Sequence, residues 1–171
     1  LNHSDWKFLR MRPPNFPTIR IAQFAELIRS NCSLISLLLE MQELKTIKTL
    51  FETPLNDYWQ KHYHFGKKGN GSHSVIGKSA FESICINTLI PMLIYYSTYK
   101  NESKYAEKAF RWMQEIKAEN NFVTRIFNEQ GLKMRHSGDS QGCIEWYHEY
   151  CTFKKCAQCE VGKQIVKKTL V

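Results

Sequence analysis

The longest apolar stretch of the chain, residues 80–99, reads AFESICINTLIPMLIYYSTY. It is long enough to cross a bilayer, but it contains the polar residues Glu82 and Asn87, which are rare inside membrane-spanning helices. We therefore expect a buried central helix. Pro91 has no N–H group to donate, and in a regular helix its ring collides with the carbonyl group of Asn87, so a kink is expected near Asn87.

Shorter helices are predicted after this stretch. Ser103 is expected to begin a helix whose apolar stripe runs over residues 105–116. Asn120 or Asn121 is expected to begin a shorter helix that Gly131 ends. Helical periodicity then continues through the C-terminal region.

The N-terminal part is predicted to be helical as well, with Ile21, Phe24 and Ile28 on one face of a helix. Thr53 followed by Pro54 is typical of the start of a short helix. No segment alternates convincingly between apolar and polar residues. The sequence thus predicts an all-α fold, an irregular multi-helix domain with a kinked central helix and a C-terminal cysteine knuckle. Its 171 residues favour a single helical domain over residues 1–171.

The charge of the chain is strongly basic, with a formal net charge of +8. The basic excess is concentrated in residues 1–30, 61–80 and 131–171, whereas residues 101–130 are balanced. Such clustering is what a nucleic-acid footprint needs, and a basic surface that serves only solubility is the alternative. The candidate phosphate contacts are Arg10, Arg12, Arg20, Lys67, Lys68, Lys154 and Lys155.

Residues 62–72 form the clearest loop of the sequence and contain three glycines, two lysines and two histidines. This loop is expected either to contact phosphate groups or to be a plain connector, and it lacks the flanking strand and helix of a P-loop. An enzyme with a site around Asn87, His62 and His64 is a further hypothesis. No Ser/His/Asp or Cys/His triad is identifiable to support it.

Three of the six cysteines lie within residues 151–159 in a C-x4-C-x2-C spacing, with two lysines between them. Three thiolates at this spacing suit a tetrahedral zinc ion or, as the less favoured alternative, an iron–sulfur cluster. Thiols that are free or merely buried are the third alternative. A bound metal would act as a closed structural staple.

The fourth metal ligand is not fixed by this spacing. In a continuous helix the Cα atoms of Cys143 and Cys151 lie roughly 12 Å apart, which is too far for one tetrahedral site. Cys143 is therefore expected in the core. His148 lies three residues before Cys151, where side chains are neighbours on a helix surface. The predicted metal ligands are Cys151, Cys156, Cys159 and His148, whereas an iron–sulfur cluster would need a distant cysteine, Cys85 or Cys32.

A secretory signal has a charged segment followed by an apolar one, and the opening of the sequence does not show this pattern. Without an export signal, the cysteines are expected to be reduced and the protein to be cytoplasmic. No membrane partner is expected.

Several motifs along the chain, from residue 6 to about residue 166, together resemble a bacterial family of unknown function, the domain of unknown function 2851 (DUF2851). Their order and spacing carry the resemblance more than any single motif. The motifs are Trp6–Gln23, Tyr58-Trp59 with Phe65–Lys67, Asn87–Pro91, Ala118–Asn121, Ser140-Gln141, and Tyr150-Cys151 with Lys155-Cys156, Cys159 and Val161-Gly162.

This resemblance implies that the chain is the helical C-terminal half of a protein of roughly twice its length, whose N-terminal half is similar to nuclease-like folds. Any catalytic carboxylates would then lie outside this chain. The family pattern covers Cys151, Cys156 and Cys159, has an aliphatic residue at the position of Cys143, and does not require a histidine at position 148.

The leading hypothesis is a metal-stapled helical accessory module that binds nucleic acid non-specifically. Whether this fragment is an enzyme stays open, with a non-catalytic role favoured. The alternative is a protein-interaction scaffold that packs on its own N-terminal half.

Overall fold

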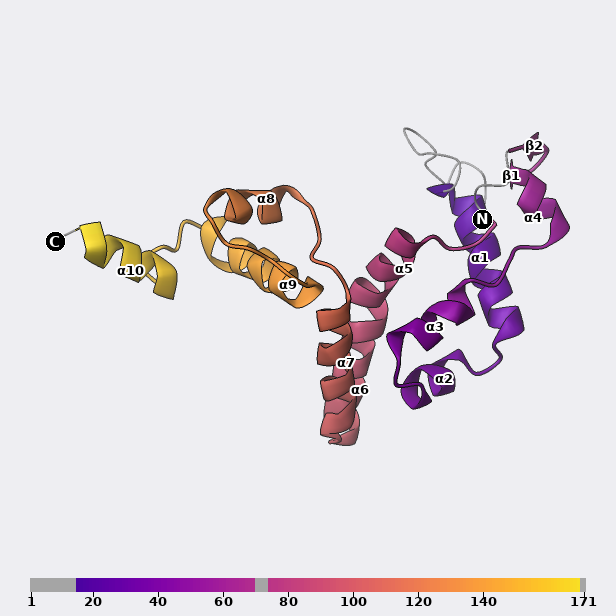
Figure 1. Ribbon diagram of the computed structural model, residues 1–171, viewed down its shortest axis with the longest axis horizontal. Coiled ribbons are helices and arrows are strands. Elements are labelled where there is room, and N and C mark those ends of the chain that lie inside the picture. The colour runs from indigo at the N-terminus through magenta and orange to yellow at the C-terminus, as the bar shows by residue number, and fades with distance from the viewer. Residues whose placement is uncertain (1–14, 70–73, 170–171) are drawn as a thin grey trace. The chain divides into compact units, whose positions relative to one another are not determined.

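The computed structural model describes residues 15–69 and 74–169, which are mostly helical (Figure 1). This confirms the predicted all-α fold class. The chain forms two compact units, Leu1–Tyr105 and Ala106–Val171. The single domain expected for residues 1–171 stays a prediction, because compactness does not show which parts fold independently.

None of the helices in the described ranges combines the length and the apolar composition needed to cross a membrane.

The N-terminal unit begins with three helices, α1 (Pro17–Ser30), α2 (Leu34–Glu40) and α3 (Leu44–Phe51). A short helix, α4 (Asp57–Lys61), leads into a two-stranded hairpin, β1 (His62–His64) and β2 (Lys67–Lys68). The central helical stretch follows as α5 (Lys78–Ile84), the π-helix η3 (Cys85–Leu89) and α6 (Ile90–Lys100). The boundary between the two units falls within α7 (Ser103–Glu115).

Near Asn87, where the sequence predicts a kink, the chain forms a π-helical turn, and the kink itself stays a prediction. The N–H group of Ile90 donates to the carbonyl oxygen of Cys85, five residues earlier. Asn87 itself is exposed, and its Nδ2 atom donates to the carbonyl oxygen of Ser83 at 2.9 Å. The extra residue in the turn gives Pro91, which has no N–H group, a place in a continuous helical path.

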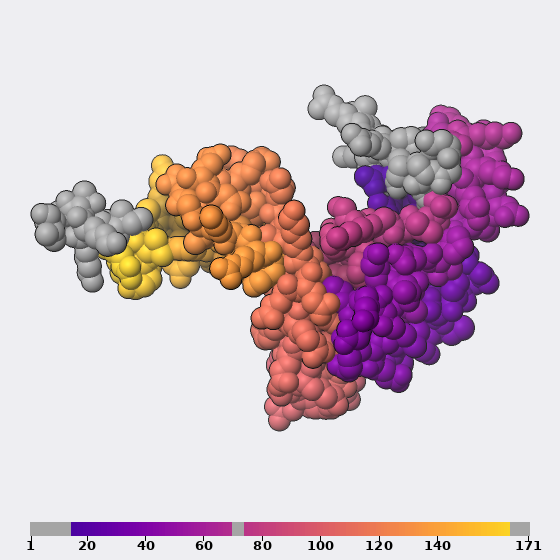
Figure 2. All heavy atoms as spheres, viewed as in Figure 1, coloured from indigo at the N-terminus to yellow at the C-terminus, as the bar shows by residue number. Residues whose placement is uncertain are grey.

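The core of the N-terminal unit forms where α1, α3 and α5 meet. Ile19 and Leu27 of α1 are buried, and Ile47 of α3 is almost fully inaccessible. The rings of Phe51 and Phe81 pack edge to face with centroids 5.2 Å apart. Figure 2 shows the N-terminal helices, in indigo and purple, closely packed in space-filling form.

The apolar face predicted for the first helix is not the face that α1 buries. Ile21, Phe24 and Ile28 are 48%, 58% and 47% exposed, respectively. The buried positions, Ile19, Gln23 and Leu27, include a polar residue, so hydropathy alone selects the wrong stripe.

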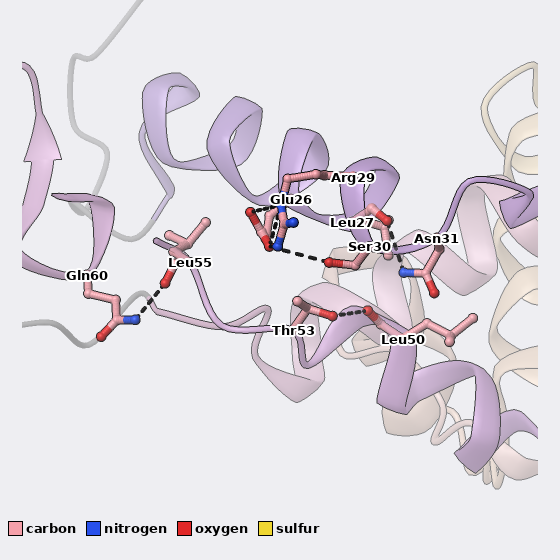
Figure 3. Close-up of polar contacts among 9 residues, drawn as sticks. All are labelled: Glu26, Leu27, Arg29, Ser30, Asn31, Leu50, Thr53, Leu55 and Gln60. Carbon is pink, nitrogen blue, oxygen red and sulfur yellow. Dashed lines mark hydrogen bonds and ion pairs between the residues drawn. The ribbon is translucent and has the colours of Figure 1, made fainter. Parts of the chain in front are cut away.

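Side-chain hydrogen bonds hold the turns of this unit (Figure 3). The hydroxyl group of Thr53 donates to the carbonyl oxygen of Leu50 at 3.0 Å, at the end of α3. Because Thr53 closes one helix, the next helix is capped instead by Asn56, whose Oδ1 atom accepts from the N–H group of Trp59 at 3.1 Å. The helix start predicted at Thr53 is therefore wrong by a few residues.

The C-terminal unit contains α8 (Phe122–Glu129), α9 (Ser137–Trp146), the π-helix η4 (Tyr147–Cys151) and α10 (Glu160–Thr169). Asn121 caps α8 in a reciprocal pair with Thr124, and Gly131 follows the helix with φ +89°, as predicted for its two ends. Helices α8 and α9 pack side by side (Figure 1), with Phe127 stacked on Trp146.

Buried hydroxyl groups tie α9 to the last turn of α7 and to the segment that follows α7. Ser137 Oγ donates to the carbonyl oxygen of Met113 at 2.8 Å, and the N–H group of Glu119 donates to Ser140 Oγ at 3.2 Å. Gln141 Nε2 donates to Glu119 Oε2. Glu119, Ser140 and Gln141 therefore have a structural role, because these bonds satisfy polar groups away from water.

Replacing Ile47 by alanine tests the core of the N-terminal unit. Ile47→Ala should lower the free energy of unfolding by about 2–5 kcal/mol, because it removes buried methyl groups and leaves a cavity. Lys45→Ala, on the exposed side of the same helix, should change it by less than about 0.5 kcal/mol. Chemical denaturation followed by circular dichroism measures both, and equal effects would contradict this description of the core.

Candidate nucleic-acid interface and cysteine knuckle

The hairpin β1–β2 occupies most of the segment predicted to be a loop. His62 lies opposite Lys68 and His64 opposite Lys67, and Gly66 adopts φ +68° in the turn. Strands of three and two residues are too short to show an alternating pattern, which is why the sequence did not reveal them.

Three exposed lysines, which we call the hairpin lysines, lie in this part of the chain. They are Lys67 and Lys68 of β2 and Lys61, the last residue of α4. No carboxylate in the described ranges forms an ion pair with any of them. By contrast, Lys48 lies 2.8 Å from Glu52 and Lys78 lies 3.8 Å from Glu82. The positive charge of the hairpin is therefore not compensated locally.

Aromatic side chains belong to the same part of the chain as these lysines. Phe65 at the turn is 68% exposed, and its ring meets Trp59 edge to face at 5.2 Å. Tyr58 stacks on His62 with ring centroids 4.1 Å apart, and its hydroxyl oxygen accepts from the N–H group of Gly66 at 2.9 Å. These contacts fix the turn and leave one phenylalanine facing solvent.

The start of α1 anchors the hairpin. Thr18 Oγ1 donates to the carbonyl oxygen of Tyr63 at 2.8 Å, and the rings of Phe16 and Tyr63 pack edge to face at 5.5 Å. Helix α4 and the hairpin form a projecting corner of the N-terminal unit (Figure 2).

The seven predicted phosphate contacts do not all belong to this corner. Arg10 and Arg12 lie outside the described residues. Arg20 is half-buried in α1, where it donates to Gln23 and Asn15. Lys154 and Lys155 belong to the C-terminal unit. Lys61 and Phe65 were not among the predicted contacts. Phe65 is near Lys67 in the sequence, whereas Lys61 is brought close to the end of β2 by the hairpin, where the N–H group of Gly69 donates to the carbonyl oxygen of Lys61.

A Schellman turn separates the first two cysteines of the knuckle, the segment from Cys151 to Cys159. The N–H group of Lys155 donates to the carbonyl oxygen of Tyr150 at 2.9 Å, and the N–H group of Lys154 donates to the carbonyl oxygen of Cys151 at 3.1 Å. Lys154 occupies the left-handed position of this turn, with φ +53°. The turn that ends η4 therefore sets the backbone positions of both lysines.

Cys159 is the most strongly held of the three knuckle thiols. It is buried, and its Sγ atom accepts from the indole Nε1–H of Trp146 at 3.0 Å. The backbone N–H group of Gly162, together with the Trp146 indole, lowers the pKa of Cys159 from its ordinary value. Donors aimed at sulfur favour the thiolate, which is the form that binds metals.

Cys151 and Cys156 are exposed. Burial raises the pKa of Cys151, and the charges of Cys159 and Cys156 raise it further, so the three thiols interact electrostatically. In this conformation, however, the described residues contain no group of three or more histidine, cysteine, aspartate or glutamate side chains placed to hold a metal ion. The metal site at Cys151, Cys156, Cys159 and His148 stays a prediction.

Cys143 and Cys85 are both buried, which bears on their expected roles. Cys143 is buried in α9, as the helix geometry predicts. Cys85 is fully buried in the N-terminal unit, and burial, followed by the charge of Glu82, raises its pKa to about 12. A thiol that stays protonated is a poor ligand, so Cys85 does not suit the fourth position of an iron–sulfur cluster.

Comparison with known families decides the identity of the chain. The family described as "Protein of unknown function (DUF2851)" matches residues 1–122. The chain belongs to this family. The hairpin lies within the matched residues of the DUF2851 chain, whereas the knuckle lies beyond them, so the resemblance of residues 150–162 to the family stays a prediction. The comparisons found no similar protein among those with curated descriptions and no similar solved structure.

Gly162 of the DUF2851 chain permits a close backbone contact within the knuckle. A Cβ atom at this position would lie 2.2 Å from the carbonyl oxygen of Cys156, much closer than atoms can approach. Glycine costs stability in the first turn of a helix such as α10, so its presence here is explained by this contact.

Replacing Gly162 by alanine should disrupt the knuckle. We expect Gly162→Ala to destabilise the C-terminal unit by about 1–3 kcal/mol, as overpacking does, and to expose Cys159. Gly142→Ala is the matched control, because its Cβ atom would meet nothing within 4 Å. That change should stabilise α9 by about 0.5–1 kcal/mol. Thermal denaturation and the alkylation rate of Cys159 measure these effects, and unchanged protection of Cys159 in Gly162→Ala would contradict the packing.

Proposed function

We propose that this chain is a helical accessory module that binds nucleic acid without sequence preference and whose cysteine knuckle is stapled by a metal ion, with zinc favoured over an iron–sulfur cluster. The observation that carries the first part is the hairpin, where uncompensated lysines adjoin an exposed phenylalanine. The protein as a whole is proposed to be bacterial and cytoplasmic. The six unpaired cysteines support a reducing compartment.

The three hairpin lysines suit a phosphate backbone. Lys67 and Lys68 form one strand and Lys61 is the last residue of the helix that leads into the other, so three exposed lysines lie within one short segment. Phosphate contacts of this kind position a nucleic acid without reading its sequence. They also release condensed counterions, so the affinity depends steeply on salt.

Phe65 and its neighbours suit an unpaired base. Exposed aromatic rings beside basic residues are the usual platform for single strands, because every base has a face that can stack. The ring of Phe65 packs edge to face on Trp59, and the residue is largely exposed. Single-stranded DNA or RNA is therefore the favoured form of the ligand.

The knuckle would provide a second basic site. Lys154 is exposed, and the ammonium group of Lys155 lies 4.7 Å from the centroid of the Phe153 ring. A metal bound by the neighbouring cysteines would fix the loop that carries both lysines. The N–H donors around Cys159 support this proposal, because metal-bound thiolates accept such hydrogen bonds.

The exposed face of α1 favours a second candidate, a scaffold that packs on the N-terminal half of the same protein. Ile21, Phe24 and Ile28 form an apolar stripe about half accessible to solvent. Contiguous apolar surface of this kind commonly marks an interface. An enzyme site near Asn87 has less support, because Asn87 is exposed and bonds to the helix backbone.

Charge removal on the hairpin tests nucleic-acid binding. Lys67→Ala with Lys68→Ala should weaken binding to a fluorescent oligonucleotide and reduce the salt slope of log K by about 2. Lys45→Ala with Lys78→Ala removes the same charge from exposed helix positions and should leave the slope unchanged. Phe65→Ala should weaken single-strand binding more than duplex binding. Absence of binding to any DNA or RNA at about 50 mM salt would overturn the proposal.

Elemental analysis tests the staple. Protein purified without chelators should contain about one zinc or iron per chain, because three soft ligands and one imidazole complete a tetrahedral site. Cys156→Ser with Cys159→Ser should abolish the metal content. Cys32→Ser, which changes an exposed cysteine of the other unit, should retain a zinc ion but would disrupt an iron–sulfur cluster that uses Cys32 as its distant ligand. Metal-free native protein would remove this part of the proposal.

A further inference from the structure

A cavity of about 530 Å³ opens between α1, α2, α3 and α5 in the N-terminal unit. Most of its wall is apolar and includes Phe24, Leu27, Leu34, Phe51 and Leu89. Its volume lies within the range of about 300–1,000 Å³ that is typical of pockets for small molecules. It is distinct from the hairpin surface, since none of the hairpin lysines lines it.

Arg20 is the one charged residue among those that line this cavity. Its Nη1 atom donates to Gln23 Oε1 at 2.9 Å, and its Nη2 atom donates to Asn15 Oδ1. Both acceptors are neutral amides. In the described part of the chain Arg20 forms no ion pair, so its charge is compensated by no carboxylate.

The guanidinium group is held in place by its hydrogen bonds to these two amides, without an ion pair to any of the described residues. Gln23 is buried, and its Nε2 atom donates to the carbonyl oxygen of Val75 at 3.2 Å, which fixes the direction in which Oε1 accepts from Arg20. Burial lowers the pKa of Arg20 from its ordinary value. An arginine has five N–H donors, and the two amide bonds leave the remainder available to an acceptor on a ligand.

This combination specifies the chemistry of a ligand. An apolar cavity binds a hydrocarbon or aromatic body, and a preorganised guanidinium at its wall binds a carboxylate through paired hydrogen bonds. A nucleic-acid backbone offers charge but no apolar body to fill the space. A purely apolar ligand would leave the half-buried charge of Arg20 without a counterion.

We propose that this cavity is a binding site for a small amphipathic carboxylate, with its apolar body between α1, α3 and α5 and its carboxylate on Arg20. The site does not depend on nucleic-acid binding. Ser83 and Thr88, which also line the cavity, add hydroxyl groups to an otherwise apolar wall.

Calorimetric titration of the full chain with decanoate, below its micellar concentration, tests the site. Decanoate should bind with about one molecule per chain, whereas decan-1-ol and decylammonium, which have the same apolar body, should bind at least tenfold more weakly. Arg20→Gln should weaken decanoate binding by about 10- to 100-fold, the range for loss of a charge-assisted hydrogen-bonded pair. Arg29→Gln, on the same helix but paired with Glu26 away from the cavity, should bind decanoate as the unchanged chain does.

A second variant separates loss of the site from loss of the fold. Ser83→Phe places a ring in the cavity from an exposed position of α5, so it should abolish decanoate binding and preserve the circular dichroism spectrum. Decanoate binding by both Arg20→Gln and Ser83→Phe that equals binding by the unchanged chain would show adsorption to apolar surface and overturn the proposal. Equal affinity for decan-1-ol would show an apolar docking groove instead, and absence of decanoate binding would also overturn it.

Discussion

Pro91 cannot donate a backbone hydrogen bond, and the conformation of the central helical stretch accommodates this missing bond. The π turn η3 absorbs the defect and also sets which residues face the core. In a regular α-helix, residues four apart drift by about 40° around the axis at each step, and a wider turn reduces this drift. The turn thereby keeps residues that are four positions apart in the sequence on the same buried face of the helical stretch. The buried residues in this repeat are Phe81, Cys85, Leu89, Leu93 and Ser97.

Local signals explain most of what could be predicted from the sequence. Asn121 and Gly131 bound α8 correctly because a side-chain cap and a left-handed glycine act within a few residues of the helix ends. The hairpin was missed because its strands are too short for a pattern. Thr53 was misassigned because its hydroxyl bonds backwards to Leu50, which only the folded turn reveals. The buried face of α1 depends on tertiary packing of Gln23, and hydropathy does not report it.

The candidate sites show the same division between local and distant information. The spacing of the knuckle cysteines is read directly from the sequence, and helix geometry predicts the burial of Cys143. The hydrogen bonds that Trp146 and Gly162 donate to Cys159 could not be predicted, because they depend on how the residues on either side of the knuckle fold. Lys67 and Lys68 were selected as candidates from composition. Lys61 was not, because the strand pairing that brings it close to them cannot be read from the sequence. The cavity beside Arg20 belongs wholly to this second class.

The backbone at Lys154 has a consequence of its own. A left-handed conformation costs a residue with a side chain about 1–2 kcal/mol relative to the right-handed form, and glycine avoids most of that cost. Helix α8 uses glycine at the equivalent position of its terminal turn, but η4 uses lysine. Departures from local preference of this kind concentrate where function opposes stability. At this turn the chain has a lysine at a position where glycine would make the folded state more stable. The turn is therefore less stable than it could be, but it carries a positive charge.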